Sequence, residues 1–428
     1  MAERLAYHTP STVGSSANQN SFFQLGVIIL SGGAAFYAFA TLSALQETIK
    51  IALNLSDRQI SLLQGPALYL PPLVIGIPLG LVIDRFSRTR LLSLFTALEV
   101  VGTVTTALAS NFVTVLLARA LIGSMQAANA MNASALLAER VAPNQRGRTL
   151  MALGVLQIAS VSAAFALGGE LAAYFAHTSN GWRWSMLGLT APLVLVFFLT
   201  VWLREPPRLN DTARIPGWRE TSAAIWHYRA KLVTLSFGLV IVSVGYTAAL
   251  VWTTPILARR FNLSSGRIGT LMGMVLLISG LLGFLLGGTL ADLCQRTGGP
   301  RRLISLMMVL ALMQIPSGFY GVMPTVPLLI LMLLVLCLTC HMKSIVCTTV
   351  TTLVVPEELL GVSFGVINAI SAIFSSAAPV AVSVLADRIG GVEGIRQGLT
   401  SVCVITSLVG AATFAVGRRY FPGIGKDN

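Results

Sequence analysis

Long apolar runs follow one another along almost the whole chain, and short polar segments separate them. A run of about 20 apolar residues crosses the hydrocarbon core of a bilayer as a helix. Helices also satisfy their own backbone in lipid, which open sheets do not. Twelve such runs predict twelve transmembrane helices at residues 22–45, 60–83, 91–110, 113–138, 149–175, 183–203, 232–257, 267–291, 302–321, 326–353, 362–386 and 397–417.

The composition agrees with an all-α integral membrane protein. Hydrophobic residues make up 55% of the 428 residues and charged residues only 11%. A soluble domain needs more charge than this to cover its surface. Residues 1–21 are polar and carry no cleavage pattern, so they predict a cytoplasmic N-terminal tail rather than a secretory signal peptide.

Lys and Arg residues are distributed unevenly between the connecting segments. The net charge is +13, and 19 of the 29 Lys and Arg residues fall in tails and segments on one side of the expected membrane, against eight on the other side. Cytoplasmic segments carry such an excess. The pattern predicts a protein of the cell (inner) membrane with both termini in the cytoplasm, and it argues against nucleic-acid binding.

The sequence contains no pattern that is typical of catalysis or of a bound metal. The five cysteines lie in or beside apolar runs, and the CLTC sequence at 337–340 lacks the companion pair of a zinc site. The four histidines are scattered along the chain. We therefore expect neither enzyme activity nor a cofactor.

The chain contains an internal repeat. GLVIDRFSRTR at 80–90 and GTLADLCQRTGGPRR at 288–302 share a Gly, an Asp four residues later and an Arg four residues after that. This repeat predicts two pseudo-symmetric six-helix bundles in parallel orientation. The expected parts are an N-terminal tail, a first bundle, a cytoplasmic linker, a second bundle and a C-terminal tail, at 1–21, 22–203, 204–231, 232–417 and 418–428.

These features resemble the major facilitator superfamily. RALIG at 119–123 is similar to a motif in its fourth helix, and the Asp-Arg turn is similar to its signature loop. LNLSDRQISLLQGPALYLPPLVIGIPLGLVIDRFSR, NQRGRTLMALG and GWRWSMLGL resemble the Spinster-like branch. The resemblance implies the major facilitator fold and a transporter that carries a small molecule through one central site by alternating access.

The sequence departs from the Spinster-like branch at positions that would titrate. Ala38 and Phe39 stand where the branch carries Asp-Arg, and Gln126 stands where it carries Glu. We therefore expect no proton coupling through the usual sites of the family. Glu99 and His341 remain as candidates for coupling, since both lie inside expected helices.

Lys343 lies near the middle of the expected helix at 326–353. An ammonium group is costly at this depth of a bilayer. Its helical neighbours are small and mildly polar, which favours a cavity wall, so we expect Lys343 to attract an anionic solute with a carboxylate or phosphate. His341 points ~200° away around the helix. The alternative is a structural pair between Lys343 and Glu99 or Glu170.

Other polar and aromatic residues are candidates for the wall of a central cavity. Gln126, Asn129 and Asn132 recur every three residues on one expected helix. Hydrogen bonds between helices and aromatic packing are the ordinary alternatives, and for Arg119 we expect a structural role of that kind. The expected substrate-binding residues are Lys343, Gln126, Asn129, Tyr246, His341 and Trp252, with Tyr69 as a further aromatic candidate.

The first Asp-Arg turn lies beside an acid at the end of the fourth expected helix. We expect these side chains to form a charge cluster that docks on the helix N-terminus near 361–363 and closes the cytoplasmic side. The second turn has no matching acid, so its cluster is expected to be weaker. The expected gating residues are Asp84, Arg88, Glu139, Asp292 and Arg296.

The sequence predicts a monomeric secondary or facilitative transporter of a small organic solute, with an anion as the favoured solute and the lipid bilayer as its other partner. Two alternatives remain open. One is a proton-coupled exporter of amphipathic or lipid-like compounds. The other is a membrane sensor that transports nothing.

Overall fold

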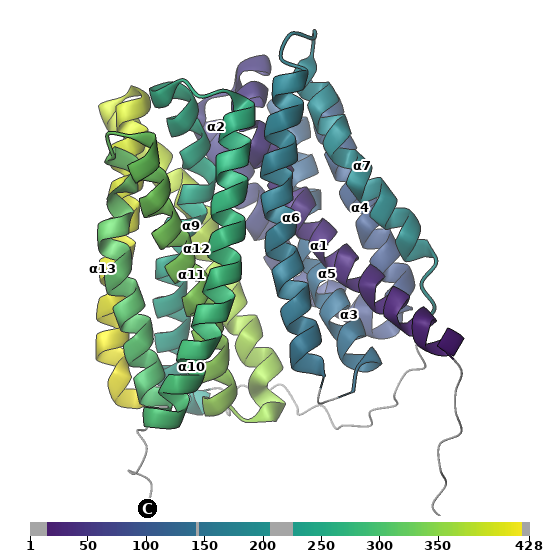
Figure 1. Cartoon of the computed structure of the whole chain (residues 1–428), viewed down its shortest axis with the longest axis vertical. Helices are drawn as coiled ribbons and strands as arrows, with labels where there is room; N and C mark the ends of the chain where they lie inside the picture. The colour runs from purple at the N-terminus through teal and green to yellow at the C-terminus, as the bar shows by residue number, and fades with distance from the viewer. Residues whose placement is uncertain (1–14, 143–144, 206–225, 422–428) are drawn as a thin grey trace, which may run out of the picture.

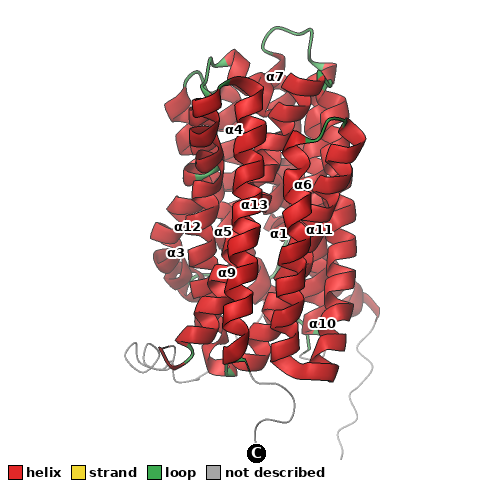
Figure 2. Cartoon of the chain, turned by 90° about the vertical axis from the view of Figure 1, so that its left-hand side faces the viewer, coloured by secondary structure: helices red, strands yellow, loops and turns green. Residues whose placement is uncertain are grey.

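The computed structural model describes residues 15–142, 145–205 and 226–421, and every regular element in these ranges is helical (Figure 2). The first half of the chain contains α1 (Ser15–Ala52), α2 (Asp57–Gln64), α3 (Pro66–Arg85), α4 (Arg88–Leu108), α5 (Phe112–Arg140), α6 (Arg146–Tyr174) and α7 (Gly181–Val201). The second half contains α9 (Arg229–Phe261), α10 (Ser265–Ser317), α11 (Val326–Val354), α12 (Glu357–Ile389) and α13 (Gly391–Gly417), with short 3-10 turns at Gly318–Val322 and Arg418–Tyr420.

The described helices account for the twelve expected crossings. Ten of them are long and apolar enough to span a membrane by length and composition. One of these, α10, changes direction at Gly299, which has a φ of 63° that favours glycine, so it contributes two arms. The apolar helix α3, with three internal prolines, supplies the remaining crossing. The expected fold class is therefore confirmed.

The helices form two bundles that lie side by side (Figure 1). Helices α1 to α7 build one bundle and α9 to α13 the other. The start of α1 and the end of α13 lie in the lower part of Figure 1, which we call the inner end; the opposite end is the outer end. The helix α1 begins seven residues before the expected first span, and most of the expected linker lies outside the described residues.

The N-terminus of α4 is held by a carboxylate from beyond α7. Glu205 accepts hydrogen bonds from the backbone N–H groups of Arg88 and Thr89, each at 2.9 Å, and from the Ser87 hydroxyl at 2.6 Å. A helix N-terminus favours a negative charge. Partial burial raises the pKa of Glu205, but these hydrogen bonds prevail and lower it to about 2. The loop between α3 and α4 is thereby fixed to the end of α7.

The two bundles meet closely along α6 and α10. A Cβ atom on Gly269 would lie 2.4 Å from the carbonyl oxygen of Phe165, and one on Gly169 would lie 2.5 Å from that of Ser265. The Ser162 hydroxyl donates a hydrogen bond to the carbonyl of Gly273 at 2.6 Å. The bundles therefore touch backbone to backbone at this seam, which we call the α6–α10 seam.

A central cavity that is closed at the outer end

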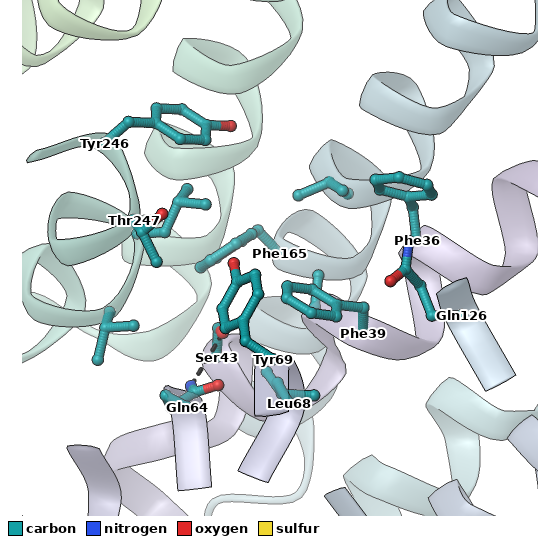
Figure 3. A pocket seen from close by; sticks show the side chains of 14 residues that line it. Phe36, Phe39, Ser43, Gln64, Leu68, Tyr69, Gln126, Phe165, Tyr246 and Thr247 are labelled. Atoms are coloured by element: carbon teal, nitrogen blue, oxygen red, sulfur yellow. Dashed lines mark hydrogen bonds between the residues drawn. The ribbon is translucent and has the colours of Figure 1, made fainter. Parts of the chain in front are cut away.

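A cavity of about 210 Å³ lies between the two bundles (Figure 3). Helices α1, α3, α5 and α6 and the residue Gln64 line it from one bundle, and α9 lines it from the other. No charged side chain occurs among the lining residues. They are Phe36, Phe39, Ala40, Ser43, Gln64, Leu68, Tyr69, Gln126, Val161, Phe165, Tyr246, Thr247, Leu250 and Val251.

Aromatic rings form much of the cavity wall. Phe39 and Tyr69 pack edge to face, with ring centroids 5.6 Å apart. Tyr246 packs in the same way on the ring of His341 behind it, at 5.4 Å. Rings in this arrangement gain more than their buried area alone provides. The cavity therefore suits a solute with a flat apolar body.

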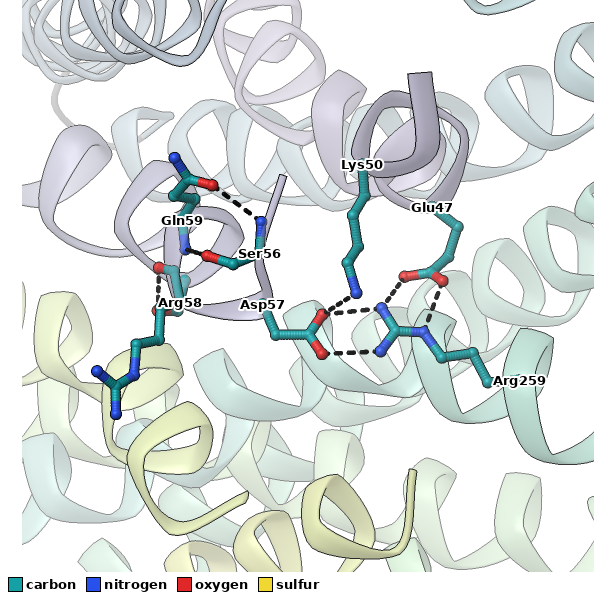
Figure 4. Close-up of polar contacts among 8 residues, drawn as sticks. Glu47, Lys50, Ser56, Asp57, Arg58, Gln59 and Arg259 are labelled. Carbon is teal, nitrogen blue, oxygen red and sulfur yellow. Dashed lines mark hydrogen bonds and ion pairs between the residues drawn. The ribbon is translucent and has the colours of Figure 1, made fainter. Parts of the chain in front are cut away.

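An ion cluster joins the two bundles at the outer end of the cavity (Figure 4). Arg259 of α9 bonds Glu47 of α1 through Nε at 2.8 Å and Nη2 at 2.7 Å, and it bonds Asp57 through Nη1 and Nη2, both at 2.9 Å. Lys50 adds a further bond to Asp57 at 2.6 Å. Bidentate pairs between a guanidinium and a carboxylate are strong and directional. We call these four residues the outer cluster.

The electrostatics of the outer cluster favour the charged state of Asp57. Burial of the Asp57 carboxyl raises its pKa, but the hydrogen bonds from Arg259 and Lys50 outweigh that effect. The pKa of Asp57 therefore lies below its usual value. This shift means that contact with Arg259 and Lys50 favours the ionised carboxylate.

The start of α3 and the outer part of α12 also touch. A Cβ on Gly65 would come within 2.2 Å of the carbonyl oxygen of Ser376, and the hydroxyls of Ser61 and Ser383 are 3.1 Å apart. Arg58 forms an ion pair with Asp387 nearby.

The glycines in the inner parts of the same two helices face open space. A Cβ built on Gly76 or Gly80 of α3 would meet nothing within 4 Å, and the same holds for Gly361 and Gly365 of α12. Among the described residues, these two helices therefore touch at the outer end, whereas their glycines towards the inner end face open space. We conclude that the outer side of the cavity is the closed side in this structure.

Residues 27–379 match the sequence model of the Major Facilitator Superfamily. The chain belongs to this superfamily. An MFS-type efflux pump of Mycolicibacterium smegmatis is 27% identical over 414 residues, which covers 91% of each chain.

Two solved structures share the fold of this protein. A bacterial homolog of the human lysosomal transporter Spinster, in an inward-facing and unoccupied conformation, has a TM-score of 0.80 at 19% identity and covers 94% of this chain and 98% of its own. The nucleoside transporter NupG has a TM-score of 0.72 at 14% identity, covering 92% and 99%. These two likenesses show the fold of the chain. This facilitator is thus a multi-pass membrane protein of a transporter family.

Two of the expected substrate-binding residues line the cavity. Gln126 and Tyr246 belong to its wall, as does the further candidate Tyr69. Trp252 is fully buried and donates its indole N–H to the carbonyl of Pro379 at 3.1 Å, so it packs inside the second bundle. His341 touches the cavity only through Tyr246.

Lys343 does not line this cavity. Its side chain is buried, and Nζ donates a hydrogen bond to Oε1 of Gln314 on the second arm of α10. The alternative pairs of Lys343 with Glu99 and Glu170 do not occur in the described part of the chain. Asn129 is hydrogen-bonded to Glu99 instead, and Thr270 to Glu170. Spacing along one helix cannot reveal which neighbouring helix supplies an acceptor.

The three amides on α5 do not form one lining stripe. Gln126 faces the cavity, whereas Asn129 bonds Ser31 at 3.2 Å and Glu99 at 3.3 Å inside the bundle. Asn132 donates to the carbonyl of Arg88 at 2.7 Å. Three residues of helix turn by about 300°, so such a series drifts by about 60° at each step.

One part of the expected inner gate is present in this facilitator. Arg88 and Glu139 form an ion pair between α4 and α5. The side chain of Asp84 lies outside the described residues. Asp292 and Arg296 are both exposed. Docking of the first cluster on the start of α12 remains a prediction, since Gly361 has open space around it.

The outer cluster was not expected from the sequence. Glu47, near the outer end of the first expected helix, could be assigned either to proton or substrate handling or to a contact with the interface or a neighbour, and Arg259 and Asp57 were not singled out. A signal existed, because α1 and α9 are the first helices of the two bundles and they carry opposite charges near their outer ends, at Glu47 and Arg259. Comparison of equivalent helix ends would have suggested the contact.

Proposed function

We propose that this protein moves a small amphipathic organic solute across the cytoplasmic membrane by alternating access. The observation that supports this proposal is the cavity between the bundles, which has aromatic and aliphatic walls and only a few polar groups. Ligand sites with this character bind an apolar body and orient it through few hydrogen bonds. Gln64, Gln126 and Tyr246 supply such polar groups from both bundles.

The proposed cycle opens the outer end and closes the inner end. Opening the outer side requires Arg259 to leave Glu47 and Asp57, because these contacts cross between the bundles. The α6–α10 seam offers a contact without bulky side chains about which the bundles rock. Closure of the inner side brings the Arg88–Glu139 pair, with Asp84, onto the start of α12.

We further propose that the direction is export, that both termini are cytoplasmic and that the protein acts as a monomer. The name of the Mycolicibacterium smegmatis relative, an efflux pump, supports export. The excess of Lys and Arg on the inner-end segments supports the orientation. Proton coupling, if present in this chain, has to use groups other than the cavity lining, which contains no acid and no histidine.

The test is transport in proteoliposomes. We expect uptake of 2-naphthamide and 2-naphthoate, two flat aromatic probes that differ in charge, to exceed that of empty liposomes for at least one probe. Tyr246→Ala removes a cavity ring and is expected to reduce the protein-dependent uptake at least fivefold. Phe198→Ala, which removes an exposed ring on α7, is the matched control. Absence of uptake for both probes, or a Tyr246→Ala variant that equals Phe198→Ala, would refute the proposal.

A further inference from the structure

We infer that Arg119, together with Gln64 and Gln46, binds a carboxylate group of the solute at one end of the cavity. This inference rests on the proposed transport of an aromatic solute and specifies the chemistry of its polar end. It differs from the expectation drawn from the sequence, which assigned the anion to Lys343 and a structural role to Arg119.

Arg119 is a buried cation without an acidic partner. It lies on α5 and is fully buried. Its Nη2 donates to the carbonyl oxygen of Phe39 at 2.9 Å and to Oε1 of Gln64 at 3.0 Å. No carboxylate pairs with it among the described residues. Neither Ala38 nor Phe39 on α1 carries an acid, so the contact from this helix is the backbone oxygen of Phe39. A buried charge is costly unless it is paired.

The groups around Arg119 have more donors than acceptors. Gln64 gives its Nε2 to Ser43 at 2.9 Å and to Oε1 of Gln46 at 3.1 Å, which fixes the orientation of both amides. Three further buried donors find no partner in the described chain: Nε and Nη1 of Arg119 and Nε2 of Gln46. The cluster carries one positive charge and lacks acceptors. A carboxylate supplies both the negative charge and up to four acceptor sites.

This cluster borders the cavity. Gln64, Ser43 and Phe39 line it, and the Gln64 amide points towards Ser43 at its edge (Figure 3). The Phe39 ring lies 5.9 Å from the Arg119 guanidinium carbon. Oε1 of Gln64 occupies the place that a solute oxygen would take on Nη2. Rotation of the Gln64 side chain therefore exposes the guanidinium to a carboxylate whose aromatic body lies among Phe36, Phe39 and Phe165.

The matched probes 2-naphthoate and 2-naphthamide test the inference by direct binding to the full chain in nanodiscs at pH 8. The wild type is expected to bind 2-naphthoate at least tenfold more tightly, ~1.4 kcal/mol. In Arg119→Gln this preference should disappear, while the affinity for 2-naphthamide stays within threefold. Arg396→Gln is the matched control, since it removes another buried guanidinium that bonds the carbonyl of Gly321, and it should keep the preference.

Gln64→Glu provides an independent test that does not depend on losing a charge. The new carboxylate would pair with Arg119 at the same place, so it should raise the apparent Tm and abolish the preference for 2-naphthoate. Equal wild-type affinities for the two probes, or a preference that survives in both variants, would overturn the inference and leave the proposed function standing. Binding of neither probe would overturn both.

Discussion

Each half of the described chain buries one cation that meets the side-chain oxygen of a glutamine, yet the two sites differ in what surrounds them. Arg119 bonds Gln64, which lines the cavity, and two of its nitrogens have no partner among the described residues. Lys343 bonds Gln314, which also donates to the carbonyl of Leu336 at 3.2 Å inside the second bundle. On the inference above, position relative to the interface between the bundles decides which of the two buried cations serves a solute.

The largest expected effect concerns the internal site. Gln314→Leu removes the acceptor of Lys343 and is expected to destabilise the protein by about 3–5 kcal/mol, because an unpaired buried charge remains. Thermal unfolding in detergent should show a clear fall in the apparent Tm. Gln64→Leu is the comparison, and its effect should be smaller because Arg119 keeps the carbonyl of Phe39.

The double variant Gln314→Leu with Lys343→Met should recover most of the lost stability, since it replaces both partners by apolar groups. If Gln314→Leu unfolds at the wild-type temperature, the Lys343–Gln314 contact does not determine the stability of the second bundle.

The next prediction compares how accessible the Arg119 site and the Lys343 site are from the outside. Arg259→Gln removes the bonds that hold the outer cluster and is expected to shift the closed-to-open ratio by about 2 kcal/mol, roughly thirtyfold. In a Ser43→Cys background, labelling of the cavity by an impermeant maleimide from the outside should rise at least tenfold. Cys340, near Lys343, should stay unreactive. Arg260→Gln, at an exposed neighbouring arginine, serves as control, and equal labelling in both variants would contradict the gate.

A smaller effect is expected for Lys343→Gln. If an anion bound at Lys343, as the sequence alone suggested, the variant would lose at least tenfold in affinity for it; a lysine that bonds Gln314 away from the cavity predicts a loss of less than threefold. Binding of 2-naphthoate in nanodiscs measures the difference. A tenfold loss in a folded variant would place the anion at Lys343 and remove the contrast between the two sites.

The smallest effect is the pH dependence of the outer cluster. Since the pKa of Asp57 is lowered in the closed state, Asp57 stabilises that state above its open-state pKa and loses this contribution as pH falls through the lowered value. An ordinary aspartate titrates near pH 4. Maleimide reacts with the thiolate, so labelling of Ser43→Cys at each pH is divided by labelling of Ser43→Cys in the Asp57→Asn variant at the same pH. This ratio should change less than twofold between pH 8 and pH 5. It should stay below one throughout, and a strong pH dependence of the ratio would contradict this assignment.

The sequence predicted the features that depend on local pattern. Apolar run length located the helices, the repeated Asp-Arg turn revealed two bundles, and motifs indicated the superfamily, which the comparisons confirm. Helix starts were less accurate, since α1 continues to Ser15 through polar residues that an apolar pattern does not include.

The candidate site depends on contacts between helices that a single sequence does not specify. Lys343 was expected to need an acid or a watered cavity, but the amide of Gln314 on an adjacent arm accepts its hydrogen bond. Gln126 and Asn129 were expected to share a role, yet helical drift turns Asn129 towards Glu99. Arg119 was expected to have a structural role, in hydrogen bonds or packing between helices. Its unpartnered donors became visible only when the positions of Gln46 and Gln64 were known.

The order of the two buried pairs along the chain bears on how the protein is made. Gln64 and Phe39 precede Arg119, and Gln314 precedes Lys343. Synthesis proceeds from the N-terminus, and a cation at the centre of a helix costs about 2.5–3.5 kcal/mol on insertion scales. Each helix that carries a cation therefore leaves the ribosome after the segment that holds its acceptor, so the partner is available when the charged helix enters the bilayer.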